Sequence, residues 1–239
     1  MNEPNRQVAM ITGSGGNLGS AVARAFRAAG AKLALVDRHE DILHRIFPDL
    51  VDDPDCYMSG CADLTDPEEV QRVVDGAVDA FGRIDVLVNT VGGYRAGAPL
   101  HETELSTWRF MLELNAGTVF ITSRTVIPQM ISQERGKIIN LAARPGLSGT
   151  AGGSAYSASK AAVIRLTESA SEELKDKGIN VNCLLPGTID TPENREAMTD
   201  ADFSQWVEPE SLAAVILFLA SDAARDIHGA AIPVYGLSG

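Results

Sequence analysis

The sequence predicts a single α/β domain, built on a doubly wound parallel sheet of about seven strands with helices on both faces. Two patterns indicate this fold. Short apolar runs alternate with longer stretches whose apolar residues recur at helical spacing, and the first run leads into a glycine-rich turn. The 239 residues, 45% of them hydrophobic, are enough for one sizeable core. We therefore expect one domain over residues 1–239.

The apolar runs have the length and flanking turn residues of buried strands. They lie at residues 8–11, 32–37, 56–58, 84–89, 137–141, 179–185 and 230–235. Helical spacing predicts helices at 18–30, 39–50, 65–82, 105–133, 152–177 and 209–221. We expect Pro48 to close the second of these helices. We also expect Pro128 to break the fourth, because proline lacks an N–H and crowds the preceding turn.

The first strand ends in the glycine-rich segment Thr12-Gly13-Ser14-Gly15-Gly16-Asn17-Leu18-Gly19, and a helix follows. This order presents backbone N–H groups to a phosphate at a helix N-terminus, and glycines let the phosphate approach closely. An ordinary strand-to-helix turn is the alternative. Asn17 stands where glycine is commonest in such loops, but asparagine tolerates left-handed backbone angles.

Asp37 ends the second strand, about 20 residues beyond the glycine-rich segment. A carboxylate there can accept hydrogen bonds from the ribose hydroxyls of NAD and repel the 2′-phosphate of NADP. Arg38 follows directly and could receive that phosphate instead. We favour NAD(H) over NADP(H) and leave both open.

Tyr156 and Lys160 lie one helical turn apart, so their side chains share a helix face. A free phenol has a pKa near ~10, and a neighbouring ammonium should lower that pKa toward the working range. The pair is therefore a candidate proton donor and acceptor. Tyrosine and lysine also occur at this spacing by chance on many helices.

The chain has a formal net charge of −12 at pH 7. This charge disfavours binding to nucleic acid and to anionic membranes, so we expect neither partner. Three cysteines and four scattered histidines show no metal-binding spacing, and we expect free thiols and no metal. Residues 1–6 do not resemble a signal peptide, and no apolar run is long enough to span a bilayer. We expect a cytoplasmic protein.

Together these motifs resemble the short-chain dehydrogenase/reductase family over essentially the whole chain. The resemblance implies a Rossmann-type fold and an NAD(P)-dependent oxidoreductase that transfers a hydride between the cofactor and a small carbonyl, alcohol or quinonoid substrate. The residues that it assigns to cofactor binding are Gly13, Ser14, Asn17, Leu18, Gly19, Asp37, Arg38, Asp63, Leu64, Asn89, Val91, Gly92, Tyr156, Lys160, Pro186, Gly187, Ile189 and Thr191. Thr90 and Val91 depart from the family's N-N-A-G pattern.

The same resemblance implies three catalytic residues. Tyr156 donates or accepts the proton, Lys160 lowers the pKa of Tyr156 and holds the nicotinamide ribose, and Asn115 positions a proton-relay water. From its helical context alone, Asn115 would more often be an ordinary satisfied polar residue. Family members assemble through the helices around Asn115 and Tyr156, so a homodimer or homotetramer is implied.

One departure from the family stands out. Ala143 occupies the position of the family's catalytic serine, and a methyl group cannot donate a hydrogen bond to a substrate oxygen. Losing one such donor typically lowers the rate by ~10²–10³. Ser148 and Ser154 lie nearby, but either would need an unusual loop to replace the serine.

With alanine at this position, the chain resembles the dihydropteridine reductase branch of the family. Three further stretches resemble that branch: Val91-Gly92-Gly93-Tyr94, Leu147-Ser148-Gly149-Thr150, and a segment at about 188–208 that we interpret as a substrate lid. This resemblance places substrate against Ala143, Gly93, Tyr94 and Tyr156. A pterin-like, quinonoid substrate needs the serine less, because reducing its ring does not localise full charge on one oxygen.

An ordinary ketone or alcohol remains the alternative substrate. A second class of function, a cofactor-binding sensor or scaffold with weak catalysis, is motivated by the missing serine. The presence of Tyr156, Lys160 and Asn115 together favours the enzyme.

Overall fold

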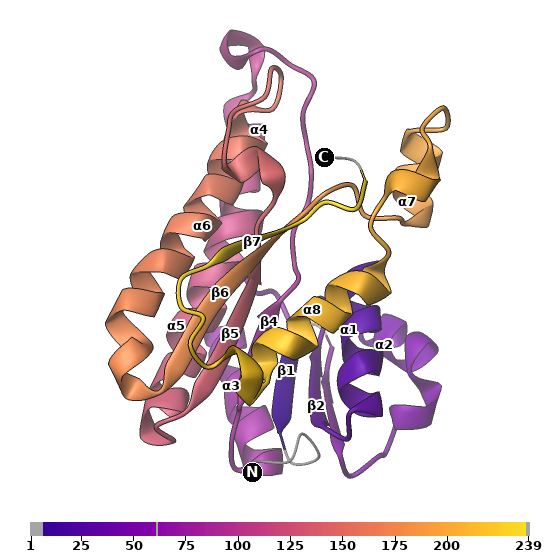
Figure 1. The fold of residues 1–239 in the computed structure, drawn as a ribbon. Coiled ribbons are helices and arrows are strands. Elements are labelled where there is room, and N and C mark those ends of the chain that lie inside the picture. Colours follow the sequence, from indigo (N-terminus) through magenta and orange to yellow (C-terminus); the bar gives the residue numbers. More distant parts are fainter. Residues whose placement is uncertain (1–6, 61, 238–239) are drawn as a thin grey trace.

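The computed structural model describes residues 7–60 and 62–237. In these residues a seven-stranded sheet runs in the order β3-β2-β1-β4-β5-β6-β7, and all neighbouring strands pair in parallel (Figure 1). The strands are β1 Val8–Thr12, β2 Lys32–Val36, β3 Cys56–Ser59, β4 Val86–Asn89, β5 Gly136–Leu141, β6 Ile179–Pro186 and β7 Ala231–Val234. The order reverses direction at β1, between β2 and β4. The predicted doubly wound sheet is confirmed.

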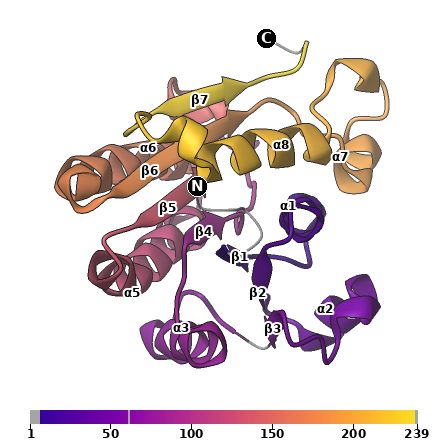
Figure 2. The ribbon, with the colours of Figure 1, turned by 60° about the horizontal axis from the view of Figure 1, so that its bottom comes forward.

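Helices cover both faces of the sheet, as Figure 2 shows. Their bounds are α1 Asn17–Ala28, α2 Glu40–Ile46, α3 Pro67–Phe81, α4 Leu105–Leu112, α5 Thr118–Ser132, α6 Ser154–Leu174, α7 Pro192–Ala197 and α8 Pro209–Ala220. Helices α1 and α8 pack on one face, and α3, α5 and α6 lie on the other.

Strand β1 shows how the two cores are divided. Ala9 and Ile11 are fully buried in the cluster beneath α1 and α8, whereas Met10 is buried in the cluster beneath α3 and α5. Successive side chains of a strand point to opposite faces, so a strand with helices on both sides must be apolar at every position. This requirement explains the continuous apolar runs in the sequence.

The predicted break at Pro128 is wrong, because α5 continues through this residue. Pro128 and Arg124 are both exposed, so solvent can satisfy the carbonyl group that loses its N–H partner. Val126 and Met130 are fully buried on the opposite side and hold the helix against the sheet. The irregularity lies instead in a π-helical turn over Glu113–Gly117, which joins α4 to α5.

Other boundaries differ only slightly from prediction. The helix expected at 39–50 divides into α2 and a 3₁₀ turn, Pro48–Leu50, and Pro48 does end the first part. Asp66 caps α3 by accepting hydrogen bonds from the backbone N–H groups of its first turn, and Gly82 ends the helix with φ of 75°. Both features are common signals for the start and the end of a helix.

The described helices include none that is both long and apolar enough to cross a membrane. Cys56 and Cys183 are free thiols. The third predicted thiol, Cys61, and the N-terminal residues 1–6 lie outside the described residues.

Candidate active site

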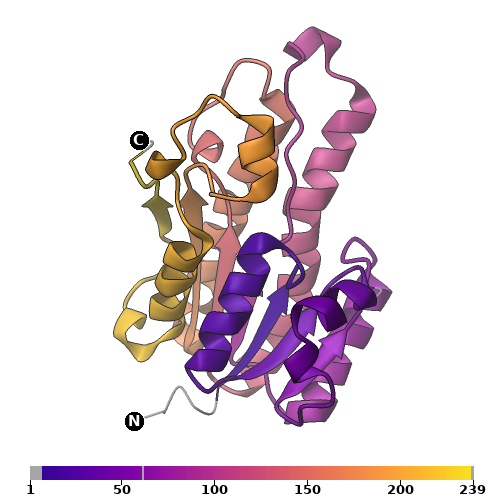
Figure 3. The ribbon, with the colours of Figure 1, turned by 90° about the vertical axis from the view of Figure 1, so that its right-hand side faces the viewer.

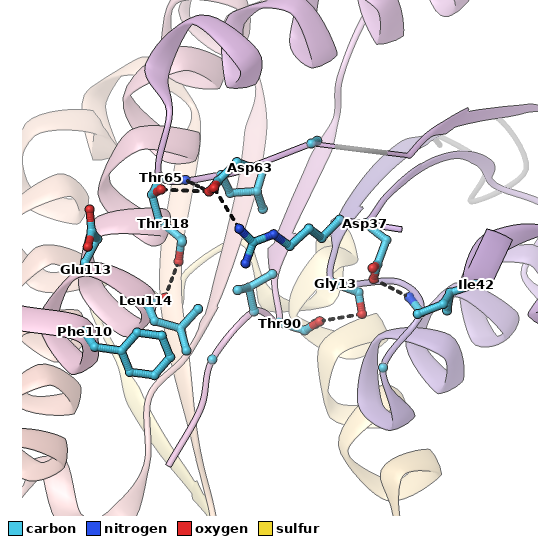
Figure 4. A pocket seen from close by; sticks show the side chains of 17 residues that line it. Gly13, Asp37, Ile42, Asp63, Thr65, Thr90, Phe110, Glu113, Leu114 and Thr118 are labelled. Atoms are coloured by element: carbon cyan, nitrogen blue, oxygen red, sulfur yellow. Dashed lines mark hydrogen bonds and ion pairs between the residues drawn. The ribbon is translucent and has the colours of Figure 1, made fainter. Parts of the chain in front are cut away.

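The carboxyl ends of the central strands bring the predicted cofactor residues to one edge of the sheet. In the parallel register Thr12 lies opposite Asn89, and Asn89 lies opposite Asn140. The loops that leave these strands border a cavity of about 590 Å³ (Figure 4). Its lining includes the predicted residues Gly13, Asp37, Arg38, Asp63, Leu64, Val91 and Gly92. A cavity at the point where the strand order reverses is the expected place for a ligand in such sheets.

The glycine-rich segment is held in a shape that only glycines allow. Gly13 has φ of +67°, and a Cβ at Gly19 would lie 2.0 Å from the carbonyl oxygen of Gly13. Buried Ser14 tightens the turn, because its Oγ donates to the Ile11 carbonyl oxygen at 2.6 Å and accepts from the Val36 N–H at 3.2 Å. Helix α1 then begins without a capping side chain.

This arrangement fits a cofactor diphosphate. The N–H groups of the first turn of a helix lack partners within the helix and carry positive partial charge. Helix α1 leaves them without a side-chain acceptor beside the cavity, and a Cβ at Gly15 would come within 2.9 Å of the Asp37 carboxylate. The loop therefore leaves room for phosphate to approach the backbone.

Asp37 and Arg38, the two charged residues that we predicted to influence cofactor choice, both have partners within the protein. The Asp37 carboxylate accepts a hydrogen bond from the Gly15 N–H at 2.9 Å. The Arg38 guanidinium pairs with the Asp63 carboxylate at 3.1 Å, and Thr65 also donates to Asp63 from its hydroxyl at 2.7 Å. The Thr65 hydrogen bonds lower the pKa of Asp63, and Arg38 adds to this effect. Figure 4 shows these interactions beside the cavity.

At the carboxyl end of β4, the Asn89 side chain has a structural role, whereas the residues that follow it line the cavity. Asn89 is 2% exposed, and its side chain donates to Asn140 Oδ1 at 2.9 Å and accepts from Thr122 Oγ1 at 2.8 Å. This amide therefore faces inward and links β4, β5 and α5. Thr90, a departure from the family pattern, donates from Oγ1 to the Thr12 carbonyl oxygen at 2.6 Å and so joins the ends of β1 and β4.

Asn115 lies fully buried in the π-helical turn. Its Oδ1 accepts from the Gly93 N–H at 2.9 Å, and its Nδ2 donates to the Gly93 carbonyl oxygen at 3.1 Å and to Ser159 Oγ at 2.9 Å. One amide thus connects the β4 loop to α6. Turns of π-helix inside α-helices often mark functional sites.

Lys160 is fully buried on α6, and its Nζ donates to the Leu141 carbonyl oxygen at 2.9 Å. Burial disfavours the ammonium and lowers the pKa of Lys160 to about 8. Gly92 lies against this lysine, since a Cβ there would approach Nζ at 3.1 Å. The amine is therefore at the cavity wall, near the predicted cofactor residues.

The predicted effect of Lys160 on Tyr156 is not observed. Burial raises the pKa of Tyr156 to about 12, and Tyr94 raises it further, rather than a lysine lowering it. The physical reason is desolvation: the Lys160 ammonium is held by the Leu141 carbonyl, while the phenol loses water on entering the protein. In this arrangement the Tyr156 phenol stays protonated through neutral pH.

Two of the predicted substrate residues, Tyr94 and Tyr156, are in direct contact. The Tyr94 ring packs edge-to-face on the Tyr156 ring, with centroids 4.8 Å apart and planes at 82°. Ala143 is buried at the end of β5, where its methyl group offers no hydrogen bond. Ser148 is exposed, whereas Ser154 lines a neighbouring cavity of about 490 Å³ together with Tyr94.

The segment that follows β6 includes the remaining predicted residues. The Gly187 N–H donates to the Val234 carbonyl oxygen at 2.9 Å, and Ile189 pairs with Val207 in an isolated bridge. Thr191 caps α7 by accepting from the Asn194 N–H at 3.2 Å. Pro186, the last residue of β6, is buried. These four residues are not part of the lining of the 590 Å³ cavity.

Two contacts were missed by sequence reasoning. Asn17 donates from Nδ2 to Glu193 Oε2 at 2.7 Å, which joins the glycine-rich segment to α7. Figure 3 shows α7, in orange, above α1, in indigo. The contact between Tyr94 and Tyr156 is the second. For the contact between Asn17 and Glu193, the unusual asparagine in the glycine-rich segment was a signal in the sequence, but nothing in the sequence identified its partner.

A cavity at the switch point of a parallel sheet, with a buried lysine behind the lining residue Gly92 and a tyrosine one helical turn before that lysine, is typical of a nicotinamide-dependent oxidoreductase. The family model described as short chain dehydrogenase matches residues 7–202. The chain belongs to this family.

Relatives extend over nearly the whole chain. The 3-oxoacyl-[acyl-carrier-protein] reductase of Thermotoga maritima is 32% identical over 238 residues, which cover 96% of each chain. The 2,5-dichloro-2,5-cyclohexadiene-1,4-diol dehydrogenase of Sphingobium indicum is 31% identical over 238 residues, covering 96% of this chain and 95% of the other. A solved NAD⁺-bound xylitol dehydrogenase has a TM-score of 0.88 and 27% identity, covering 99% of this chain and 100% of the other.

The buried Lys160 predicts a specific pH dependence of stability. Between pH 8 and about pH 10.4 the unfolded chain binds a proton at this residue that the folded chain does not, so stability rises with pH. Relative to the Lys160→Met variant, the unmodified protein should gain up to ~1.4 kcal/mol per pH unit in this window. Urea unfolding at a series of pH values measures the difference.

The exposed Lys175→Met serves as the matched control and should show no pH-dependent difference. Parallel stability curves for the unmodified protein and Lys160→Met would contradict the lowered pKa.

Proposed function

We propose that this oxidoreductase transfers a hydride between NAD(H) and a small carbonyl, alcohol or quinonoid substrate, with Tyr156 as proton donor or acceptor. The observation that carries the proposal is that buried Lys160 lies against Gly92, a lining residue of the cavity, and that Tyr156 precedes this lysine by one turn of α6. When bound, the nicotinamide supplies or accepts the hydride.

Each member of the proposed catalytic group has a distinct task. Tyr156 delivers its proton to the substrate atom that gains negative charge as carbon is reduced. Lys160 holds the nicotinamide ribose and stabilises the phenolate that remains. Asn115 fixes the π-helical turn and the Gly93 backbone, and it positions a water that returns the proton.

The proposed cofactor residues are those that resemblance assigned, in three groups. The α1 N-terminus with Gly13, Ser14, Asn17, Leu18 and Gly19 takes the diphosphate. Asp37, Arg38, Asp63, Leu64, Asn89, Val91 and Gly92 border the adenosine half, and Pro186, Gly187, Ile189 and Thr191 approach the nicotinamide. The pairing of Arg38 with Asp63 supports NAD(H), because it occupies the cation that would otherwise meet a 2′-phosphate.

A pterin-like, quinonoid ring is the substrate class that best accommodates Ala143. Reduction of such a ring spreads the developing charge, so the missing serine costs less than it does for a ketone. The segment 188–208 is the proposed lid, and Ala143, Gly93, Tyr94 and Tyr156 are the proposed substrate contacts. A relative that acts on a cyclohexadienediol supports a cyclic substrate, while the acyl-carrier-protein reductase supports an ordinary ketone as the alternative.

A second candidate is a catalytically weak NAD(P)-binding sensor or scaffold. The alanine at position 143 favours it, because a protein that only binds cofactor needs no donor at the substrate. The buried lysine and the clamped Asn115 argue for the enzyme, since buried polar groups are costly to keep without a use.

A substrate panel tests the proposed function. The purified protein is offered NADH or NADPH with quinonoid dihydropterin and with several ketones, and cofactor oxidation is followed. We expect turnover of the pterin, reduced by ~10²-fold or more in Tyr156→Phe, because general acid catalysis contributes that much.

Turnover of ketones alone would refute the pterin proposal and keep the oxidoreductase. If NADH binds without any turnover, the sensor becomes the better interpretation. Tyr57→Phe, on edge strand β3, is the matched control and should retain activity.

Cofactor choice is tested with Asp37→Asn. The amide keeps an oxygen that can accept from the Gly15 N–H but removes the charge that repels a 2′-phosphate. We expect the ratio of kcat/KM for NADH to that for NADPH to fall ~10-fold or more, which corresponds to about 1.4 kcal/mol.

Asp41→Asn removes the same charge from an exposed position on α2 and is the control. An unchanged ratio in Asp37→Asn would show that Asp37 does not select the cofactor.

We propose a homodimer or homotetramer in the cytoplasm, with α4 and α5 in a subunit interface. Leu105 is 58% exposed and Phe120 is 53% exposed on these helices, which is a large apolar area to leave in water. Phe120→Asp should shift the mass measured by light scattering toward the monomer. Val51→Asp changes an exposed residue of a turn outside these two helices and should leave the measured mass unchanged. A monomeric unmodified protein would refute the proposal.

A further inference from the structure

At Ala143 the proposed substrate side of the site lacks the hydroxyl that the serine provides in the family. Ala143 is 6% exposed, and its own carbonyl oxygen accepts from the Gly146 N–H at 2.9 Å to close a short turn. The surrounding backbone is therefore ordered, and the missing group is a side-chain donor. A donor placed at developing negative charge contributes strongly to catalysis in sites that exclude water.

Tyr94 brings a second phenol to this place. Its ring packs edge-to-face on Tyr156 with a centroid separation of 4.8 Å, a favourable geometry for aromatic pairs. The side chain is 70% exposed, so the contact does not enclose it within the protein. Burial raises the pKa of Tyr156, and the neighbouring Tyr94 adds to this effect.

The backbone on both sides of Tyr94 is fixed despite this exposure. Before it, Gly93 gives both its N–H and its carbonyl group to Asn115, at 2.9 and 3.1 Å. After it, the Arg95 guanidinium lies 3.9 Å from the centroid of the Phe110 ring on α4. A cation over an aromatic ring is a favourable contact even at an exposed site. These two contacts restrain the chain on either side of Tyr94.

Gly93 packs closely on the π-helical turn. A Cβ there would lie 2.7 Å from Leu114 Cδ2, so the Leu114 side chain would have to shift to accommodate it. Asn115 acts on this arrangement as a positioning residue, through the Gly93 backbone.

We propose that Tyr94 is a further catalytic residue, whose hydroxyl donates the hydrogen bond to the reacting substrate atom that the serine supplies elsewhere in the family. This inference rests on the proposed oxidoreductase function. The substrate carbon gains the hydride, its oxygen or nitrogen gains the proton of Tyr156, and Tyr94 keeps its own proton throughout. The Tyr156 phenolate then recovers a proton from water.

A double-mutant cycle between Tyr94→Phe and Ala143→Ser tests the inference. Tyr94→Phe keeps the ring and removes the hydroxyl, so we expect kcat to fall ~10²-fold or more with little change in KM. In the Ala143→Ser background the reinstated serine supplies the donor, so Tyr94→Phe should then cost less than about tenfold. Such non-additivity is the signature of two groups with one task.

A readout that does not use turnover accompanies the cycle. Ultraviolet titration of the free protein, with Tyr156→Phe to assign the transition, should show that Tyr94→Phe lowers the pKa of Tyr156. The dissociation constant for NADH, measured by fluorescence, and the thermal midpoint should stay unchanged, which excludes misfolding. Tyr57→Phe again controls for the loss of a phenol far from the site.

Each other outcome is also decisive. Full kcat in Tyr94→Phe, or an equal loss with and without Ala143→Ser, overturns the inference while substrate turnover leaves the proposed function intact. A rise in KM alone overturns it too and assigns Tyr94 to substrate packing. If the unmodified protein binds NADH and turns over none of the substrates, the proposed function fails, and the inference fails with it.

Discussion

The geometry of the candidate site depends on the side-chain amide of Asn115, because it joins three segments that are distant in the sequence. Its oxygen and nitrogen both bind Gly93 after β4, and its nitrogen also binds Ser159 on α6. The residue itself sits in a π-helical turn, which widens the helix and turns the amide toward the sheet edge. A fully buried amide without these partners would cost ~1–3 kcal/mol. The same bonds that satisfy Asn115 therefore also position the loop that contains Tyr94.

Burial sets the electrostatics of the pair Tyr156 and Lys160. Desolvation moves the pKa of Lys160 down to about 8 and that of Tyr156 up to about 12, so each neutral form is favoured. The spacing of Tyr156 and Lys160 in the sequence predicted a lowered pKa for Tyr156. That prediction considered the charge of the ammonium, but the sequence does not show how much water the phenol loses on folding. Residues one turn apart on a helix share a face, but their other contacts decide whether their charges interact. Here the Lys160 ammonium donates its hydrogen bond to the Leu141 carbonyl oxygen.

Much of the fold could be predicted from the sequence, for physical reasons that are local. Continuous apolar runs mark strands buried on both faces, and signals such as Asp66 and Gly82 mark the ends of a helix. The error at Pro128 arose because the sequence does not show that its helix face is exposed, where water can replace a lost hydrogen bond. The π-helical turn at Asn115 has no local signal, since it is imposed by tertiary bonds to Gly93 and Ser159.

The site was predictable where backbone shape is required and less so where side chains from different segments meet. Gly13, Gly19 and Asp37 follow from the needs of a strand–turn–helix loop, but the inward-facing bonds of Asn89 depend on two other elements. Asn17 is the clearest case. In the sequence Asn17 is only a departure from the glycine pattern of the loop, whereas in the fold its side chain donates a hydrogen bond to Glu193 on α7.

That contact is exposed, and exposed polar contacts contribute little to stability. Segment 188–208 is instead organised by its own interactions. Asp190 binds Arg195 at 2.5 and 2.6 Å, Arg195 lies 5.0 Å from the Phe203 ring, and Phe203 packs on Trp206 at 4.8 Å. The segment therefore holds its own shape, and its hydrogen bond to the glycine-rich loop is a weak one. The departure at Asn17 thus joins two segments that are distant in the sequence without fixing the conformation of either.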